Sequence, residues 1–156
     1  MVGHHDQPLG GPGPGPLHQL GVGRTEVVEG HHGGETGPGE AIFANTRGEL
    51  CEGTGTNVFV VTGGVLRTPP EASGCLLGVT RALILELAGR LHIAAEEVTL
   101  PLSAVATADE AFISSSTREV QGLSAVDGHP LPAAPGPVTT LLADAFRRMV
   151  ADDLDP

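Results

Sequence analysis

Hydrophobic residues follow a regular pattern from about residue 40 to the end of the chain. Short apolar runs bounded by turn residues predict strands at 41–44, 57–61, 65–66, 98–100, 111–114 and 120–126. Gly63 and Gly64, between the second and third runs, indicate a β-hairpin. Predicted strands and helices alternate along the chain, which favours a mixed α/β (α+β) fold around one core of moderate size.

Two longer segments have the hydrophobic spacing of helices. The first is predicted to begin near Thr80, and its apolar residues recur at Val79, Leu83, Leu87 and Leu91. The second is predicted to begin at Pro137, because proline suits the first position of a helix. Its expected apolar face consists of Leu141, Leu142, Ala145, Phe146 and Met149. A short helix is expected at 102–108.

Residues 1–39 differ in composition from the rest of the chain. They contain twelve Gly, five Pro and five His and no aromatic residue. Such a segment buries too little apolar area to offset the entropy of ordering it. We therefore expect residues 1–39 to be disordered and residues 40–156 to form the domain. The pairs His4-His5 and His31-His32 are interpreted as solvated residues of a flexible segment, and no metal site is predicted.

Charge and cysteine content narrow the possible classes of function. The chain of 156 residues has 8 basic and 19 acidic residues, a net charge of -11, which argues against nucleic acid and against an anionic membrane surface. No apolar run has the length of a membrane span and no signal peptide opens the chain, so a cytoplasmic location is expected. Cys51 and Cys75 lack metal-ligand spacing and are expected to be reduced thiols.

Three segments place glycine and small polar residues beside predicted strands or a helix: Cys51–Asn57, Leu77–Arg81 and Ile113–Glu119. In the first, Glu52 is either a fixed carboxylate at the sheet edge or a solvated residue of a polar loop. The second begins a helix, and its free N–H groups suit a phosphate, although Thr80 also suits an ordinary helix cap. The hydroxyls of the third can receive phosphate or carboxylate oxygens, or bond to their own backbone.

Taken together and in this order, the segments resemble the class IV aminotransferases, the family of branched-chain and D-amino-acid aminotransferases and aminodeoxychorismate lyase. The resemblance starts at Glu40–Phe59 and continues at Thr68–Pro70, Gly78–Arg81, Ala108–Phe112, Ser114–Thr117, Val126–Gly128 and Pro135–Thr139. It covers about residues 39–150. It implies the carboxy-terminal half of that fold, a pyridoxal 5'-phosphate (PLP) cofactor and a homodimer. The implied substrate is a small molecule, either an amino acid or aminodeoxychorismate.

The resemblance also implies roles for individual residues. Glu52 would pair with the protonated pyridine nitrogen of PLP. The backbone amides of Val79 and Thr80, together with the Thr80 hydroxyl, would hold the cofactor phosphate. Ser116 would add a hydroxyl to the phosphate, and the amides of Ser116 and Thr117 would face the phosphate or a substrate carboxylate.

The chain departs from the family where catalysis is concerned, because it contains no lysine. In the family, a lysine upstream of the segment that matches Glu40 holds PLP covalently and moves a proton between substrate and cofactor. All eight basic residues of this chain are arginine, which stays protonated and cannot replace that amine. Gly122 is a smaller departure, at a position where the family often has proline. Asn57 is expected to tie the loop after Glu52 to its strand.

Two explanations account for the missing lysine. Residues 1–39 are either a misread, out-of-frame start joined to an authentic carboxy-terminal half, or part of a decayed remnant, and their composition favours the first. The expected function is PLP-dependent transfer of an amino group between an amino acid and a 2-oxo acid, in a truncated or inactive form with no catalytic residue of its own. The alternatives are aminodeoxychorismate lyase and a non-catalytic α/β binding module.

Overall fold

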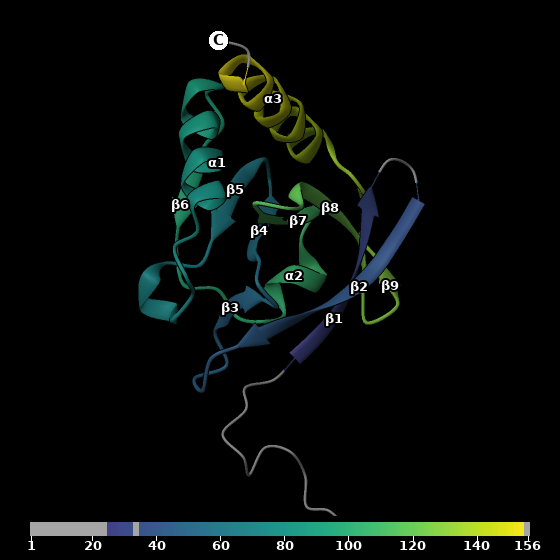
Figure 1. The fold of residues 1–156 in the computed structure, drawn as a ribbon. Helices are drawn as coiled ribbons and strands as arrows, with labels where there is room; N and C mark the ends of the chain where they lie inside the picture. Colours follow the sequence, from purple (N-terminus) through teal and green to yellow (C-terminus); the bar gives the residue numbers. More distant parts are fainter. Residues whose placement is uncertain (1–24, 33–34, 155–156) are drawn as a thin grey trace, which may run out of the picture.

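The computed structural model describes residues 25–32 and 35–154, which form one mixed sheet of nine strands, with two long helices on one face and a short helix on the other (Figure 1). The strands are β1 Thr25–His32, β2 Glu35–Ala44, β3 Leu50–Gly53, β4 Asn57–Thr62, β5 Val65–Thr68, β6 Ala95–Glu97, β7 Glu110–Ser115, β8 Glu119–Val126 and β9 His129–Pro130. The helices are α1 Val79–Arg90, α2 Ala104–Thr107 and α3 Pro137–Leu154, with a 3-10 turn at Glu71–Ser73. The strand order is β3-β2-β1-β8-β7-β4-β5-β6, and β9 pairs with β8.

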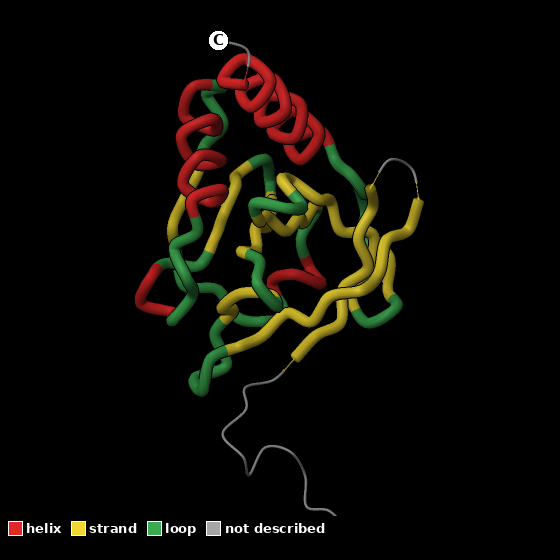
Figure 2. The backbone as a smooth tube through the Cα atoms, in the orientation of Figure 1, coloured by secondary structure: helices red, strands yellow, loops and turns green. Residues whose placement is uncertain are grey.

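The strands from β3 to β4 in this order curl around a common interior. Figure 2 shows these strands, in yellow, surrounding the short helix α2. One buried cluster fills the interior and draws on strands from both sides of the curl, including Ile42 of β2, Val58 of β4, Ile113 of β7 and Leu123 of β8. Val105 of α2 belongs to the same cluster. The curl matters for the site because it brings Glu40 of β2 next to Thr56, just before β4, and Arg118, just after β7.

The other face of β4 and β7 packs against α1 and α3. Phe59 of β4 and Phe112 of β7 stack with ring centroids 4.7 Å apart. Ile84 of α1 and Leu142 of α3 are fully buried against this pair. Successive residues of a strand point to opposite faces, so β4 and β7 contribute to both cores and are almost wholly buried. Each such buried side chain contributes about 1.5–3 kcal/mol.

The start of α3 is fixed by a carboxylate from β7. The buried side chain of Glu110 accepts hydrogen bonds from the backbone N–H groups of Val138 (3.1 Å) and Thr139 (2.9 Å). These are donors that a helix leaves unsatisfied at its N-terminus. A Cβ atom at Gly136 would overlap the carboxyl group of Glu110, so this packing requires glycine.

The mixed α/β class and both long helices confirm the sequence predictions. The predicted strand at 98–100 is wrong, because the ladder with β5 is formed by Ala95–Glu97. All three residues of β6 are exposed, so its position leaves no hydrophobic signal. Two side chains assigned to the apolar faces of helices are also exposed, Val79 at 75% and Leu141 at 42%.

The expectation that residues 1–39 are disordered is wrong for residues 25–32 and 35–39, which lie in β1 and β2. β1 pairs with both β2 and β8, and its register shifts at Gly30. Backbone hydrogen bonds to β2 and β8 support a strand here despite the glycines of residues 1–39, and composition does not reveal such pairings. The remaining residues of the predicted disordered segment, His4-His5 among them, lie outside the described residues.

Two further features of the described residues bear on function. No group of three or more His, Cys, Asp or Glu side chains in residues 25–32 and 35–154 is placed to hold a metal ion. In the same part of the chain, no helix combines the length and the apolar character needed to cross a membrane.

Candidate functional site

Glu52 lies on the edge strand β3, where its side chain is half-buried and directed to the segment before α1. Its backbone pairs with Phe43 of β2, which fixes its position in the sheet. Its carboxylate oxygen Oε2 accepts a hydrogen bond of 2.8 Å from the backbone N–H of Leu76. Glu52 is therefore a positioned carboxylate at the sheet edge, the first of the two alternatives that the sequence left open.

Asn57 holds the same segment from strand β4. Its Nδ2 donates a hydrogen bond of 2.6 Å to the carbonyl oxygen of Leu76. Leu76 is thus held through its N–H by Glu52 and through its C=O by Asn57. A Cβ atom at Gly78 would lie 2.5 Å from Oδ1 of Asn57, so only glycine fits this approach. Asn57 was expected to tie the loop after Glu52 to its strand, whereas its side chain fixes the start of α1.

The start of α1 presents backbone N–H groups that no side chain caps. The N-cap residue is Gly78, which has no side chain to cap the helix, and Val79 and Thr80 follow as the first residues of the helix. The Thr80 side chain is buried, and Arg81 is buried beside it. Arg81 Nη2 donates to the carbonyl of Pro69 at 2.8 Å and to Glu97 Oε2 at 2.6 Å, which anchors the first turn of the helix.

The hydroxyl-rich segment after β7 divides into a buried and an exposed part. Ser114 is buried, is the cross-strand partner of Asn57, and its hydroxyl has no hydrogen-bond partner among the described residues. Ser116 and Thr117 are exposed in the turn that follows. Ser115 Oγ accepts a hydrogen bond of 3.1 Å from the backbone N–H of Arg118, so this hydroxyl does bond to its own backbone.

Hydrogen bonds to Leu76 thus join the segment Cys51–Asn57 to the start of the segment Leu77–Arg81. Hydrogen bonds connect Glu52 and Asn57 to the residues before Thr80, but none within the described chain links these residues to Ser116 or Thr117. The cross-strand pair of Asn57 and Ser114 brings the third segment to the same face of the sheet. Sequence reasoning did not single out Ser114, because its burial depends on the neighbouring strand.

The two cysteines flank the Glu52–Leu76 contact and are both free. Burial raises the pKa of the Cys51 thiol, and the negative charge of Glu52 raises it further. Burial also raises the pKa of Cys75. A raised pKa leaves less of the reactive thiolate at a given pH.

Alkylation of these thiols by iodoacetamide at pH 8 is therefore expected to be slower in the folded protein than in the chain unfolded in urea. The difference should narrow as the pH is raised to 10, because the thiols of the unfolded chain are then largely ionised while those of the folded chain continue to ionise. Peptide mass spectrometry over time measures each cysteine separately. Equal rates in the folded and unfolded chains at pH 8 would contradict the assigned burial.

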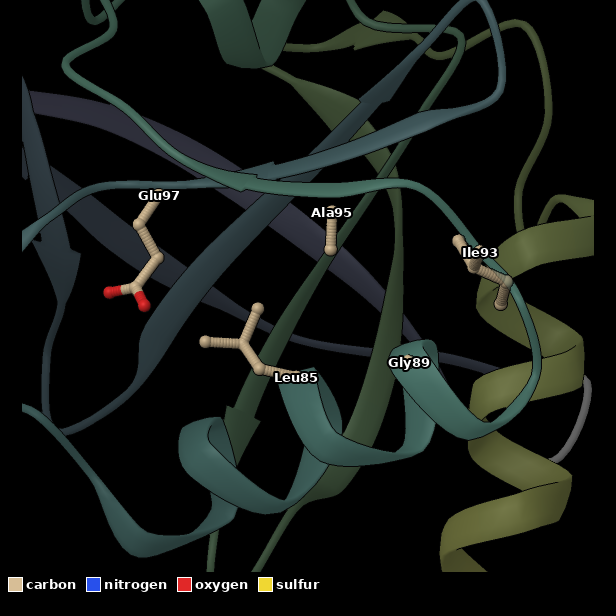
Figure 3. A pocket seen from close by; sticks show the side chains of 5 residues that line it. All are labelled: Leu85, Gly89, Ile93, Ala95 and Glu97. Atoms are coloured by element: carbon tan, nitrogen blue, oxygen red, sulfur yellow. The ribbon is translucent and has the colours of Figure 1, made fainter.

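A cavity of about 410 Å³ lies between α1 and β6. Figure 3 shows Leu85 of α1 and Ala95 of β6 facing each other across it. Its other lining residues are Gly89, Ile93 and Glu97. None of the residues predicted for the cofactor lines this cavity.

Comparison with known proteins identifies the family. A sequence profile described as Amino-transferase class IV matches residues 27–126. The chain belongs to the class IV aminotransferase family. The match begins at Val27 in β1, which agrees with the strands found upstream of residue 40.

The relatives with matching sequences include branched-chain-amino-acid aminotransferases. The enzyme of Pseudomonas aeruginosa is 37% identical over 74% of this chain and 38% of its own length. The enzyme of Escherichia coli K12 is 39% identical over 69% of this chain and 35% of its own length. This class IV chain therefore spans less than two fifths of the length of these relatives.

Solved class IV structures show the same fold. The branched-chain aminotransferase of Thermobaculum terrenum in its PLP form superposes with a TM-score of 0.70 and 36% identity, over 72% of this chain and 38% of that one. The Escherichia coli enzyme gives a TM-score of 0.69 with 38% identity, over 70% of this chain and 37% of that one. The enzyme of Thermoproteus uzoniensis, solved with norvaline, gives a TM-score of 0.70 with 37% identity, over 74% and 38% of the two chains.

The described residues fit part of a PLP cofactor. The uncapped start of α1 suits a phosphate, and the fixed carboxylate of Glu52 suits a protonated ring nitrogen. Ser114, whose buried hydroxyl has no partner among the described residues, is paired with Asn57 across the strands. The described residues do not fit covalent attachment, because the chain contains no lysine. The fit is therefore to a cofactor held by non-covalent contacts.

Proposed function

We propose that this chain provides the phosphate-binding and ring-binding side of a PLP site used for amino-group transfer. It binds PLP or pyridoxamine 5'-phosphate reversibly. It does not complete the transfer with its own residues, because the reaction requires an amine that the sequence lacks. The names of its relatives support branched-chain amino acids as the substrate class of the complete enzyme.

The observation that carries this proposal is the fixation of Leu76 from both sides. Two strands contribute polar side chains, Glu52 and Asn57, to hold one peptide segment immediately before an uncapped helix. An ordinary polar loop does not need this arrangement, and Gly78 is the residue that permits it. The result is a carboxylate and a helix N-terminus fixed relative to one another.

Each residue has a distinct proposed role toward the cofactor. Bound PLP would supply an electron-accepting ring, which is the chemistry that this family takes from it. Glu52 would keep the ring nitrogen protonated through its negative charge. The N–H groups of Val79 and Thr80 and the Thr80 hydroxyl would bind the phosphate, and the turn at Ser116 and Thr117 would add further donors.

The binding test uses pyridoxamine 5'-phosphate, which carries no aldehyde. Because this chain has no lysine to react with an aldehyde, PLP and pyridoxamine 5'-phosphate should bind with similar affinity, and pyridoxamine without phosphate should bind far more weakly. Isothermal titration measures all three. Borohydride reduction followed by intact-mass measurement should show no PLP adduct on a side chain. Equal affinities for pyridoxamine 5'-phosphate and pyridoxamine would contradict the proposed phosphate-binding site.

Thr80→Val tests the proposed phosphate-binding site at the start of α1 directly. This change keeps the shape of the side chain and removes its hydroxyl, so the affinity for pyridoxamine 5'-phosphate should fall about tenfold or more, as for one hydrogen bond to a charged group. Thr107→Val is the matched control, because Thr107 is an exposed threonine on α2. If both variants bind like the parent, the Thr80 hydroxyl is only part of the helix packing.

We also propose that the protein self-associates. Three apolar side chains are exposed around the start of α1: Leu76, Leu77 and Val79. Adjacent apolar surface of this kind tends to drive association. Analytical ultracentrifugation should show dimers or larger species that increase with concentration, and the replacement of Leu77 and Val79 by serine should reduce them. A monomer over the whole concentration range would contradict the proposal.

The alternative function is a non-catalytic binding module. The absence of lysine favours it, since the fold would remain while the chemistry is lost. Binding of pyridoxamine 5'-phosphate separates the two cases, because a module that has lost the cofactor has no reason to retain affinity for its phosphate.

The lyase reaction on aminodeoxychorismate is a further alternative, and it uses the same cofactor site. Product analysis with a lysine-bearing homologous segment added to this chain would distinguish the lyase reaction from amino-group transfer.

A further inference from the structure

A second polar cluster lies inside the curled part of the sheet, next to the proposed cofactor site. At its centre is Glu40 of β2, whose side chain is only 3% exposed. A buried carboxylate is costly unless other groups compensate its charge. The groups that do so come from two different turns, one that directly follows Glu52 and one that carries Ser116 and Thr117.

The first turn follows Glu52. Thr56 Oγ1 donates a hydrogen bond of 2.6 Å to Glu40 Oε1, and both residues are buried. A Cβ atom at Gly53 would lie 2.6 Å from Glu40 Oε1 and would overlap Thr56 Oγ1. The backbone directly after Glu52 is therefore pressed against Glu40, with no space for a side chain.

The second turn carries Ser116 and Thr117. Arg118, the next residue, places Nη1 at 3.2 Å from Glu40 Oε2 and at 3.2 Å from Oε1 of Gln121. Glu40 Oε2 has no aligned hydrogen-bond donor among the described residues, so charge attraction to Arg118 is its compensating contact. The backbone N–H of Arg118 in turn donates to Ser115 Oγ, which connects the guanidinium to the fold of the turn.

We propose that Glu40 is a positioning residue that holds these two turns at a fixed separation. One carboxylate oxygen fixes the turn after Glu52 through Thr56, and the other fixes the turn of Ser116 and Thr117 through Arg118. These residues are distant in sequence, and within the described chain no hydrogen bond joins the two turns directly. The relevance of this separation to a cofactor rests on the proposed function, but the link between the turns does not.

The two oxygens can be tested separately. Glu40→Gln keeps an acceptor for Thr56 and removes the charge that attracts Arg118, so the turn at 115–118 should be released while the turn at 53–56 stays fixed. Thr56→Val should do the opposite, because it removes the hydroxyl and leaves the charge. In hydrogen exchange followed by mass spectrometry, exchange in the released turn should accelerate about tenfold, the order expected for loss of one charge-assisted contact.

Arg118→Met breaks the same ion pair from its more exposed end and should reproduce the effect of Glu40→Gln if the latter does not fold. The double variant should exchange no faster at 115–118 than either single variant, since both remove one interaction. Arg67→Met is the control, because Arg67 is similarly exposed and has one ion pair, to Glu96, on a distant part of the sheet.

Exchange that is unchanged at 115–118 in both Glu40→Gln and Arg118→Met overturns the proposal. An equal acceleration over the whole sheet also overturns it, because it indicates a general loss of stability. Titration with pyridoxamine 5'-phosphate is the second readout, and Glu40→Gln should weaken binding while Arg67→Met should not. If the parent does not bind this ligand, the proposed function fails, and the exchange data still decide whether Glu40 holds the turns.

Discussion

The purified chain is expected to transfer no amino group between isoleucine, leucine or valine and 2-oxoglutarate faster than free PLP does. The reaction needs a group that accepts a proton at one atom and returns it at another, and such general acid–base catalysis contributes about 10²–10⁴-fold. The eight Lys/Arg residues are all arginines, which remain protonated at ordinary pH, and none of the seven histidines lies in the site segments Cys51–Asn57, Leu77–Arg81 and Ile113–Glu119. A coupled assay for glutamate, run beside the homologous Escherichia coli enzyme, measures the difference.

The same assay has an outcome that would overturn this expectation. Turnover above the free-PLP background that disappears in Glu52→Gln would show that another residue of this chain replaces the lysine. Glu52→Gln is the appropriate control because it retains an acceptor for the Leu76 N–H and removes only the charge. If turnover persists in that variant, it comes from the solution or from a contaminant.

The second large effect concerns folding. Gly136→Ala should lower the free energy of unfolding by about 3 kcal/mol, because the new methyl group would displace the Glu110 carboxylate from the N-terminus of α3. Gly89→Ala is the matched control. No atom lies within 4 Å of a Cβ at that exposed position in α1, so alanine should raise stability by up to about 1 kcal/mol.

Urea unfolding followed by circular dichroism measures both variants under the same conditions. The change in the free energy of unfolding is expected to have opposite signs in the two variants. A methyl group has no space at Gly136, whereas at Gly89 it would meet no atom within 4 Å. A Gly136→Ala variant as stable as the parent would mean that Glu110 is not needed at the start of α3. In that case the two hydrogen bonds to Val138 and Thr139 would add little to the packing of the helix.

Local sequence determined much of the fold. The spacing of apolar residues located α1 and α3, and the apolar runs located β4, β5, β7 and β8, because a buried face imposes its period on the sequence. The same reasoning failed for β1 and for the first part of β2. Those strands depend on hydrogen bonds to β8 and to each other, which glycine-rich sequence does not reveal.

The candidate site shows the same division between sequence and structure. The sequence by itself determined that Glu52, Thr80 and Ser116 lie in motifs of class IV type, and that no lysine accompanies them. Only the tertiary structure decided that Asn57 and Glu52 hold one peptide segment between them, and that Glu40 reaches Thr56 and Arg118. These contacts join residues from separate strands and turns, and their distances are set by the curl of the sheet, which no local pattern of residues encodes.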